Sequence, residues 1–296
     1  MGHHNHTHHH DTESLGDRRL MLAILANMLL TAVQVAGGIV SGSLSLVADA
    51  LHNFSDASTL LIAWLARRIG RQPADDLRTF GYQRAEVIAA LVNLVSLVMI
   101  GLYLIYEGIW RIFQPQVIEG WIVVIVAGGA LLVDVATAVL TWTMSKHSMN
   151  IRAAFLHNLS DALASVGVVL AGSLILLYGW YWTDTALTLI ISAYVLYQAA
   201  TLLPQTIHLL MEGTPEGLSV VEVKAAMEVV KGVRNVHHIH LWQIDEQRRA
   251  LEAHVVIDCF EDTAGIKAAL KERLDEAFDI THSTLEFEIE NCGDGA

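Results

Sequence analysis

Long stretches without a charged side chain are the feature that most constrains how this chain of 296 residues folds. A helix rises about 1.5 Å per residue, so about 20 apolar residues are needed to cross about 30 Å of hydrocarbon. Residues 20–48 carry no charge, and Ser41-Gly42-Ser43 divides them into two segments. We expect six membrane-spanning helices, over residues 20–40, 44–65, 87–105, 121–143, 153–177 and 183–203.

The composition excludes several other classes of protein. Hydrophobic residues make up 53% of the chain and charged residues only 17%, against about 25% charged in soluble proteins. A fibrous, disordered or disulfide-rich secreted protein is therefore excluded. The 31 acidic and 18 basic residues give a net charge of −13, which excludes a nucleic-acid binder. The two cysteines, Cys259 and Cys292, fit a reducing compartment.

Orientation follows from the basic residues that flank the apolar segments, because cytoplasmic loops carry an excess of Lys and Arg. Only Arg111 falls on one side of the predicted membrane. The others fall on the opposite side: Arg18, Arg19, Arg67, Arg68, Arg71, Arg78, Arg84, Lys146 and Arg152. We therefore expect both termini in the cytoplasm, and the short loops favour a bacterial inner membrane.

The chain becomes polar after the sixth apolar segment. Its pattern predicts a helix (219–231), two strands (236–244 and 251–258), a helix (263–278) and a strand (283–289). Leu251, Ala253, Val255 and Ile257 alternate with period two, as in a half-buried strand. We therefore expect a disordered His-rich tail over 1–17, a six-helix membrane domain over 18–212, and a cytoplasmic αββαβ domain over 213–296.

Histidines are concentrated in the N-terminal tail, from His3 to His10. Such a tract is either an expression tag or a native segment that captures metal weakly. The interruptions at Asn5 and Thr7 favour a native tail.

Two nearly identical segments place ionisable residues inside predicted membrane helices. His52 and Asp56 stand one helical turn apart in the second helix, and His157 and Asp161 repeat this spacing in the fifth. The hexapeptides that begin at the two histidines differ only where Phe54 replaces leucine. Ionisable residues at membrane depth are costly and usually functional. One such pair alone is equally consistent with an interhelical hydrogen bond, but its repetition favours a shared site.

The topology suggests how the two pairs meet. The second and fifth helices are the middle members of two helix triplets and run in opposite directions, as in transporters built from inverted repeats. Antiparallel packing then brings His52 level with Asp161, and Asp56 level with His157. Two imidazole nitrogens and two carboxylate oxygens favour a tetrahedral divalent ion, above all Zn²⁺, although Cd²⁺ and Co²⁺ suit the same ligands.

Three further motifs accompany these pairs: the run from Gly42 to Ala50, the run from Phe80 to Glu86, and Met211-Glu212-Gly213-Thr214-Pro215. Together they resemble the cation diffusion facilitator family over nearly the whole chain. The resemblance implies a homodimeric metal/proton antiporter with six membrane helices and a metallochaperone-like cytoplasmic domain. It also implies a transport site at His52, Asp56, His157 and Asp161. Histidine in both pairs is similar to the zinc-preferring branch.

The resemblance bears on two further metal sites. Some relatives bind metal in the loop after the second helix, through an aspartate and two histidines. This chain keeps Asp75 but has Arg78 and Tyr82 at the matching positions, so we predict no site there. A cytoplasmic site of relatives matches three histidines that are all present: His237, His254 and His282.

Other residues keep open roles. His238 and His240 have the same strand parity and so share a face opposite His237; with Cys292 they are either additional ligands or plain surface residues. Asp134 lies midway along the fourth helix with no partner in the motifs; it either lines a water-filled cavity or carries a proton. Asp49, one turn before His52, caps its helix or lines the path to the site.

These patterns predict export of Zn²⁺ from the cytoplasm in exchange for protons, because a ligand nitrogen must lose its proton to bind metal. A membrane-tethered zinc sensor or buffer is the main alternative. An intramembrane metalloenzyme is disfavoured, because four protein ligands close the zinc shell and no His-Glu-x-x-His motif exists. A bis-histidine haem protein would leave the aspartates unexplained.

Overall fold

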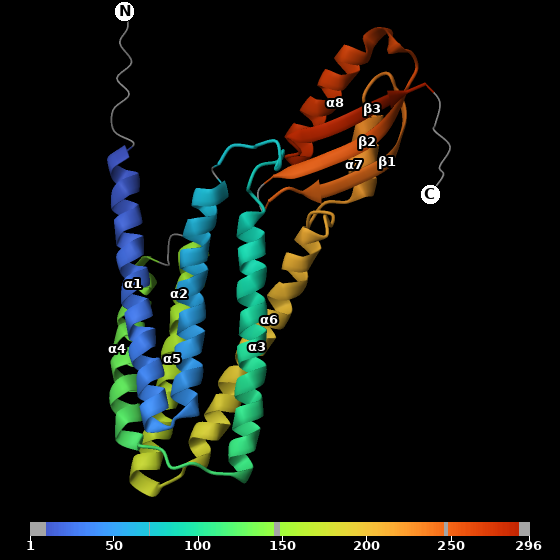
Figure 1. Cartoon of the computed structure of the whole chain (residues 1–296). Coiled ribbons are helices and arrows are strands. Elements are labelled where there is room, and N and C mark those ends of the chain that lie inside the picture. Colours follow the sequence, from blue (N-terminus) through green and yellow to red (C-terminus); the bar gives the residue numbers. More distant parts are fainter. Residues whose placement is uncertain (1–9, 71, 145–148, 246–247, 290–296) are drawn as a thin grey trace, which may run out of the picture. The chain divides into compact units, whose positions relative to one another are not determined.

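The computed structural model describes residues 10–70, 72–144, 149–245 and 248–289 (Figure 1). Residues 1–9 of the His-rich tail and Cys292 lie outside this part of the chain. The chain forms two compact units. The first consists of Met1–Ile62 and Val92–Thr201, and the second of Ala63–Leu91 and Leu202–Ala296.

Six long helices account for most of the chain as far as Leu210. They are α1 (His10–Ser41), α2 (Leu44–Gly70), α3 (Ala85–Phe113), α4 (Gly120–Met144), α5 (Met149–Tyr178) and α6 (Trp182–Leu210). Each is longer than predicted, because a helix continues through polar residues at its ends, whereas apolarity marks only the part in hydrocarbon. Helix α1 begins at His10, inside the segment that the sequence assigns to a disordered tail.

Within the described residues, four helices are long and apolar enough to cross a membrane. Their spans are Ala85–Phe113, Gly120–Leu140, Phe155–Tyr178 and Trp182–Leu210. The described part of α1 contributes only a shorter apolar segment, Asn27–Ser41. Helix α2 carries the polar residues of the repeated motif, which reduce its apolar character. Six membrane-spanning helices therefore remain a prediction, and the length and composition of the described helices support four of the six.

Helices α4 and α5 pack closely within the first unit because small residues lie where they meet. A Cβ atom added to Gly120 would lie 2.9 Å from the carbonyl oxygen of Gly172, so a side chain there would push the helices apart. The buried apolar core of the unit consists of Leu44, Leu46, Ala48, Leu104, Ile118, Val123, Ala127, Val168, Ile175, Ile191 and Val195.

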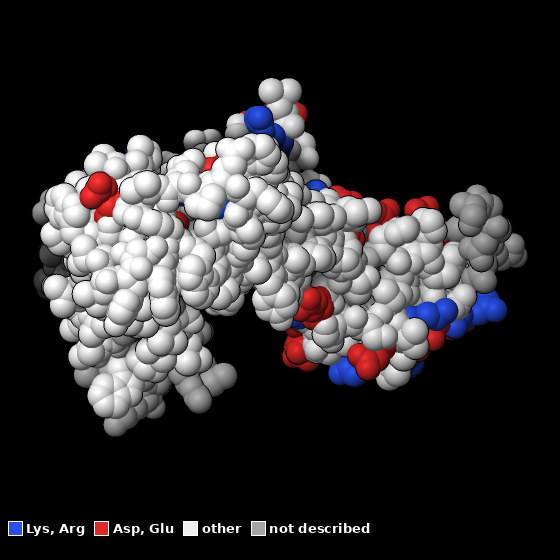
Figure 2. All heavy atoms as spheres, turned by 90° about the horizontal axis from the view of Figure 1, so that it is seen from below, with Lys and Arg blue, Asp and Glu red and all other residues white. Residues whose placement is uncertain are grey.

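Many large apolar side chains of these helices point outward instead. They include Leu29, Ile39, Met99, Leu132, Leu170 and Ile190. Figure 2 shows one face on which Lys, Arg, Asp and Glu side chains gather over the second unit and are sparse over the helices of the first. An extensive uncharged and apolar helix surface is the surface that lipid covers.

The C-terminal part of the second unit is a small mixed domain. Its elements are α7 (Val220–Glu228), β1 (Val233–Gln243), β2 (Arg249–Ile257), the 3₁₀ turn η2 (Phe260–Asp262), α8 (Thr263–Phe278) and β3 (His282–Glu288). The sheet order is β1-β2-β3, with β1 antiparallel and β3 parallel to β2. Helix α8 connects the parallel pair, which a short turn cannot join.

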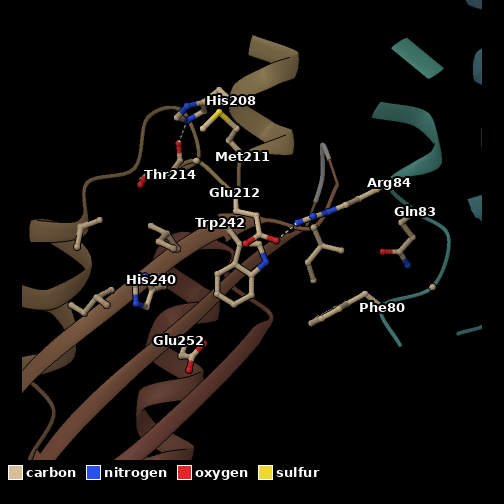
Figure 3. A pocket seen from close by; sticks show the side chains of 16 residues that line it. Phe80, Gln83, Arg84, His208, Met211, Glu212, Thr214, His240, Trp242 and Glu252 are labelled. Atoms are coloured by element: carbon tan, nitrogen blue, oxygen red, sulfur yellow. Dashed lines mark hydrogen bonds and ion pairs between the residues drawn. The ribbon is translucent and has the colours of Figure 1, made fainter. Parts of the chain in front are cut away.

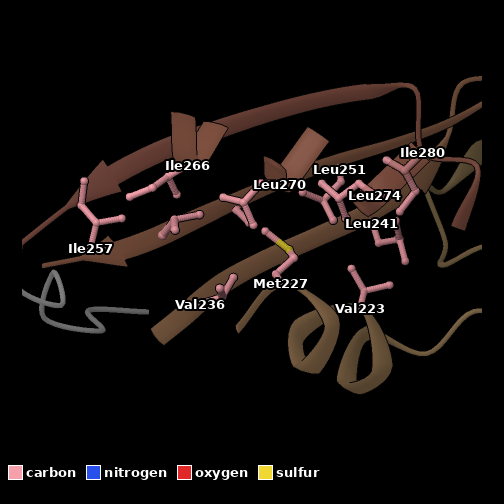
Figure 4. Close-up of a cluster of buried hydrophobic side chains, with 12 residues drawn as sticks. Val223, Met227, Val236, Leu241, Leu251, Ile257, Ile266, Leu270, Leu274 and Ile280 are labelled. Carbon is pink, nitrogen blue, oxygen red and sulfur yellow. The ribbon is translucent and has the colours of Figure 1, made fainter. Parts of the chain in front are cut away.

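One hydrophobic core holds this domain together (Figure 4). Its residues come from α7, α8, β1, β2 and the segment between α8 and β3: Val223, Met227, Val236, Leu241, Leu251, Ala253, Val255, Ile257, Ile266, Leu270, Leu274 and Ile280. Leu251, Ala253, Val255 and Ile257 of β2 are all buried as predicted, and Val256, between the last two, is buried as well. On α8 the buried residues recur every four positions, the spacing of one helix face.

Candidate metal centres

The two pairs of histidine and aspartate converge between α2 and α5. His52 Nε2 lies 3.3 Å from Asp161 Oδ1, and His157 Nε2 lies 3.4 Å from Asp56 Oδ2. Within each helix, His52 and Asp56 are 3.8 Å apart and His157 and Asp161 are 3.6 Å apart. The crosswise pairing expected of antiparallel helices is the one that the structure contains.

His52, Asp56 and Asp161 offer ligand atoms that all lie within 4.8 Å of one another. His157 joins them at 3.4 Å from Asp56 and at 3.6 Å from the other oxygen of Asp161. Zinc bonds to nitrogen and oxygen are about 2.0–2.2 Å long, which gives tetrahedron edges of about 3.3–3.6 Å between ligand atoms. Two oxygens that face the histidines, Asp56 Oδ2 and Asp161 Oδ1, are buried and accept no hydrogen bond within the described part of the chain. Such oxygens gain most from a cation. Because His52 is buried while the side chain of His157 is 42% exposed, the cluster is open on the His157 side.

Residues that the sequence did not single out surround this cluster. The ring of Tyr194 on α6 lies 6.3 Å from that of His52 in an edge-to-face arrangement. Gln34 of α1 donates a hydrogen bond to Asp49 at 2.8 Å and accepts one from Asn53 at 3.2 Å. Asn53 belongs to the repeated hexapeptide, and this repetition is the sequence feature that could have pointed to these contacts.

Asp134 has a partner, contrary to expectation. Ser165 Oγ donates to Asp134 Oδ2 at 2.7 Å, and the same hydroxyl lies 3.4 Å from Asp49 Oδ2. The Asp134 carboxylate, which the sequence left without a partner, is thus linked through Ser165 of α5 to Asp49 of α2, the helix that carries His52. Sequence spacing could not reveal this contact, because it depends on how α4 packs against α5.

Asp184, fully buried at the start of α6, holds the N-terminus of α2. It accepts hydrogen bonds from the backbone N–H groups of Leu44 (2.8 Å) and Ser45 (3.2 Å). The hydroxyls of Ser43 and Ser45 also donate to it. The first N–H groups of a helix lack partners within the helix, so Asp184 caps α2 from another helix and fixes the element that carries His52.

Both parts of the chain match known protein families. Residues 20–211 match the cation efflux transmembrane domain, and residues 215–290 match the cytoplasmic domain of cation efflux proteins. The chain belongs to the cation efflux family. This is the cation diffusion facilitator family of the sequence motifs, and the chain falls in its zinc-preferring branch. Family and apolar helices together make it a multi-pass membrane transporter.

Individual relatives resemble this cation efflux protein over both domains. The zinc transporter ZitB of Pectobacterium atrosepticum is 37% identical over 294 residues, covering 98% of this chain and 90% of its own. The cadmium, cobalt and zinc/H(+)-K(+) antiporter of Bacillus subtilis is 33% identical over 287 residues, covering 95% and 92%. The solved metal-bound C-terminal domain of the CzcD transporter from Cupriavidus metallidurans is 32% identical and covers 24% of this chain and 99% of its own, with a TM-score of 0.23.

A second cluster of potential ligands lies on the cytoplasmic sheet of this cation efflux protein. His237 on β1 and His254 on β2 are directly opposite each other, with ring centroids 5.4 Å apart. Glu288 at the end of β3 reaches both, at 2.7 Å from His254 Nδ1 and 3.5 Å from His237 Nε2. Their ligand atoms lie within 4.8 Å of one another, so the three side chains can hold one cation.

His282 is not part of this cluster within the chain. In the parallel pairing of β2 and β3 it stands opposite Ala250, whereas His254 stands opposite Glu286. Four residues along a strand separate it from the cluster by about 13 Å. Its ring instead contacts Phe80 at 5.7 Å. Glu288, which the sequence did not single out, takes the third position, because the register of two parallel strands cannot be read from their sequences.

The expected strand alternation fails at His238. This residue has a positive φ of 50°, and the register of β1 shifts between His237 and His240. The resulting bulge places the His238 ring 4.8 Å from His254 and 4.6 Å from His240. His237 and His238 therefore both lie beside His254, although strict alternation predicts opposite faces.

The loop after α2 has a hydrogen-bonded triad of Asp75, Arg78 and Tyr82, at the positions where the sequence predicts no metal site. Tyr82 donates its phenol hydrogen to Asp75 Oδ2 at 2.6 Å, and Arg78 lies over the Tyr82 ring and donates to its oxygen. The Tyr82 hydrogen bond, followed by that from the Arg78 backbone, lowers the pKa of Asp75 below its ordinary value. The carboxylate is thus already satisfied by protein groups.

A hollow of about 840 Å³ lies elsewhere in the second unit (Figure 3). Arg84 and Glu212 form an ion pair of 3.0 Å at its wall, and His208 Nε2 lies 2.9 Å from the carbonyl oxygen of Thr214. Trp242 and His240 line the side formed by the sheet. Within the described residues, no group of three close metal ligands lies in this hollow.

Proposed function

We propose that this protein exports Zn²⁺ from the cytoplasm in exchange for protons, with Cd²⁺ and Co²⁺ as further substrates. The ion binds at His52, Asp56, His157 and Asp161. The observation that carries the proposal is the crosswise convergence of two histidine–aspartate pairs between α2 and α5, with His–Asp separations of 3.3 and 3.4 Å that equal about one edge of a zinc tetrahedron.

Exchange with protons follows from the chemistry of these ligands. Free imidazole titrates near pH 6.5, and its ligand nitrogen must be unprotonated to bind metal. Protons and zinc therefore compete for the same atoms. The two aspartates balance the charge of the ion, which lowers the cost of holding it at membrane depth. The name of the Bacillus subtilis relative, an antiporter, supports this exchange.

The proposal includes the setting of the site. Six helices cross the inner membrane with both termini in the cytoplasm, and the helices alternate access by rocking around a fixed midplane site. The chain works as a homodimer. Its cytoplasmic domain binds metal through His237 and His254, with Glu288 as the third ligand within one chain; His282 remains a candidate ligand only through a rearrangement or a second copy.

The protein has no enzymatic role in this proposal, because four protein ligands leave zinc no open position for a reacting water. The second candidate function is a membrane-tethered zinc sensor or buffer. The cytoplasmic cluster of His237, His254 and Glu288 favours it, but a sensor does not need ligands enclosed between α2 and α5.

Zinc flux into proteoliposomes under an imposed pH gradient tests the proposal. We expect gradient-dependent flux in the wild type and its loss in Asp161→Ala. Asp76→Ala, which removes an exposed loop carboxylate, is the matched control and retains flux. Zinc binding without flux in the wild type would favour the sensor. Equal flux in wild type and Asp161→Ala would show that the site lies elsewhere.

A further inference from the structure

A chain of buried polar side chains runs behind the transport cluster and joins four helices. Gln34 of α1 donates to Asp49 Oδ2 of α2 at 2.8 Å. Ser165 Oγ of α5 lies 3.4 Å from the same oxygen and 2.7 Å from Asp134 Oδ2 of α4. All four residues are at most 9% exposed. Two carboxylates on different helices thus share one serine hydroxyl.

This arrangement has one hydrogen too few if both carboxylates are ionised. A serine hydroxyl carries a single hydrogen, and an ionised carboxylate is an acceptor only. Ser165 can donate its single hydrogen to Asp134 at 2.7 Å, and a hydrogen bond in the longer contact with Asp49, at 3.4 Å, then needs a second hydrogen. A carboxylic acid at either end supplies the second one, donates it to the serine oxygen and lets the serine donate onward. The geometry therefore accommodates one proton on the pair.

The charges around the pair give the same result. Two anionic carboxylates in a low-dielectric interior repel each other strongly, and a shared proton removes that repulsion. The titratable groups that face the pair are His52 on α2 and Asp161 on α5. Helix α1 contributes the neutral amide of Gln34.

The pair is connected to the transport ligands through both helices. Asp49 precedes His52 by three residues on α2, and Ser165 follows Asp161 by four residues on α5, so each lies about one turn from a ligand. A divalent ion at the cluster stabilises two ionised carboxylates at this range, whereas its departure favours the shared proton. Binding of the metal at the cluster therefore disfavours binding of the proton at the pair, although the two sites do not touch.

We propose that Asp49 and Asp134, bridged by Ser165, hold one exchangeable proton that is released when a divalent cation binds at the cluster and regained when it leaves. On release, the O–H bond of one carboxyl breaks and the proton passes to water on the side to which the site is open. The electron pair stays on the carboxylate. This inference rests on the proposed metal/proton exchange and identifies residues that supply one of its protons.

The test counts protons per zinc in the full-length protein. Asp134→Asn leaves Asp49 as a single carboxylate with Ser165 and Gln34 as donors, so no hydrogen is missing. We expect the protons released per Zn²⁺ bound to fall by one. In proteoliposomes the limiting zinc ratio falls about tenfold for each pH unit of gradient, because one proton fewer drives each ion. Asp49→Asn behaves likewise.

Two controls separate this role from a structural one. Glu107→Gln makes the same carboxylate-to-amide change on α3, away from the pair, and keeps the wild-type proton count. Asp134→Glu restores the titratable group and the count. Difference infrared spectroscopy of the wild type needs no variant: a band of protonated carboxyl must disappear when Zn²⁺ is added, and its persistence or absence overturns the inference.

The outcomes also distinguish this inference from the proposed function. Zinc flux that ignores the pH gradient in the wild type refutes the exchange itself. Wild-type exchange together with an unchanged proton count in both Asp134→Asn and Asp49→Asn refutes only the role of the pair.

Discussion

Replacing Asp184 by alanine tests how α2 is held in place. The carboxylate accepts two backbone N–H groups and two hydroxyls from the first turn of α2, and it is fully buried. In Asp184→Ala the hydroxyls of Ser43 and Ser45, which are 3.3 Å apart, can pair with each other. The N–H groups of Leu44 and Ser45 have no such substitute.

The magnitude follows from these two orphaned donors. A buried donor left without an acceptor costs about 1–3 kcal/mol, so Asp184→Ala lowers the free energy of unfolding by about 2–6 kcal/mol. Asp184→Asn keeps one acceptor oxygen and places an N–H₂ group where the other was. We therefore expect it to lose about half as much, about 1–3 kcal/mol.

Unfolding in mixed micelles with increasing SDS, followed by tryptophan fluorescence, measures this loss. Zinc binding provides a second readout, because a displaced α2 moves His52 and Asp56 away from their partners on α5. Asp76→Ala serves as the exposed control and leaves the unfolding midpoint unchanged. A loss below about 1 kcal/mol in Asp184→Ala would refute the capping argument.

Two further predictions concern the second unit. Glu288→Gln removes the carboxylate shared by His237 and His254, so the metal affinity of the cytoplasmic domain falls at least about tenfold. Zinc titration in an Asp161→Ala background measures this affinity. An unchanged affinity would contradict metal binding by the cluster. Tyr82→Phe removes the main cause of the lowered pKa of Asp75. A lowered carboxyl pKa stabilises the folded loop at pH values above the ordinary pKa, and this stabilisation is lost as the pH falls through the lowered pKa. In the variant we therefore expect Asp75 to titrate at a higher pH, as followed by NMR. An unshifted titration would contradict the contact.

Most of the correct predictions about the site came from the spacing of residues that are close in the sequence. Residues four apart share a helix face whatever the tertiary structure, so the pairs His52/Asp56 and His157/Asp161 were visible directly. The opposite direction of their helices followed from the topology, and with it the crosswise contacts seen between α2 and α5. The alternation of β2 was equally local.

Contacts set by packing or register were not visible in this way. The choice of Glu288 over His282 beside His254 depends on how β3 is registered against β2. The position of His238 depends on a bulge in β1 with a positive φ angle. No residue spacing encodes either one, because both arise from pairing between separate strands.

The sequence by itself determined that this is a membrane protein with two matched histidine–aspartate pairs, because hydrophobic length and helical periodicity are properties of the local chain. Only the tertiary structure decided that Ser165 joins Asp134 to Asp49 and that Asp184 caps α2. These contacts link helices far apart in sequence, and a buried polar group finds its partner only where packing brings the helices together.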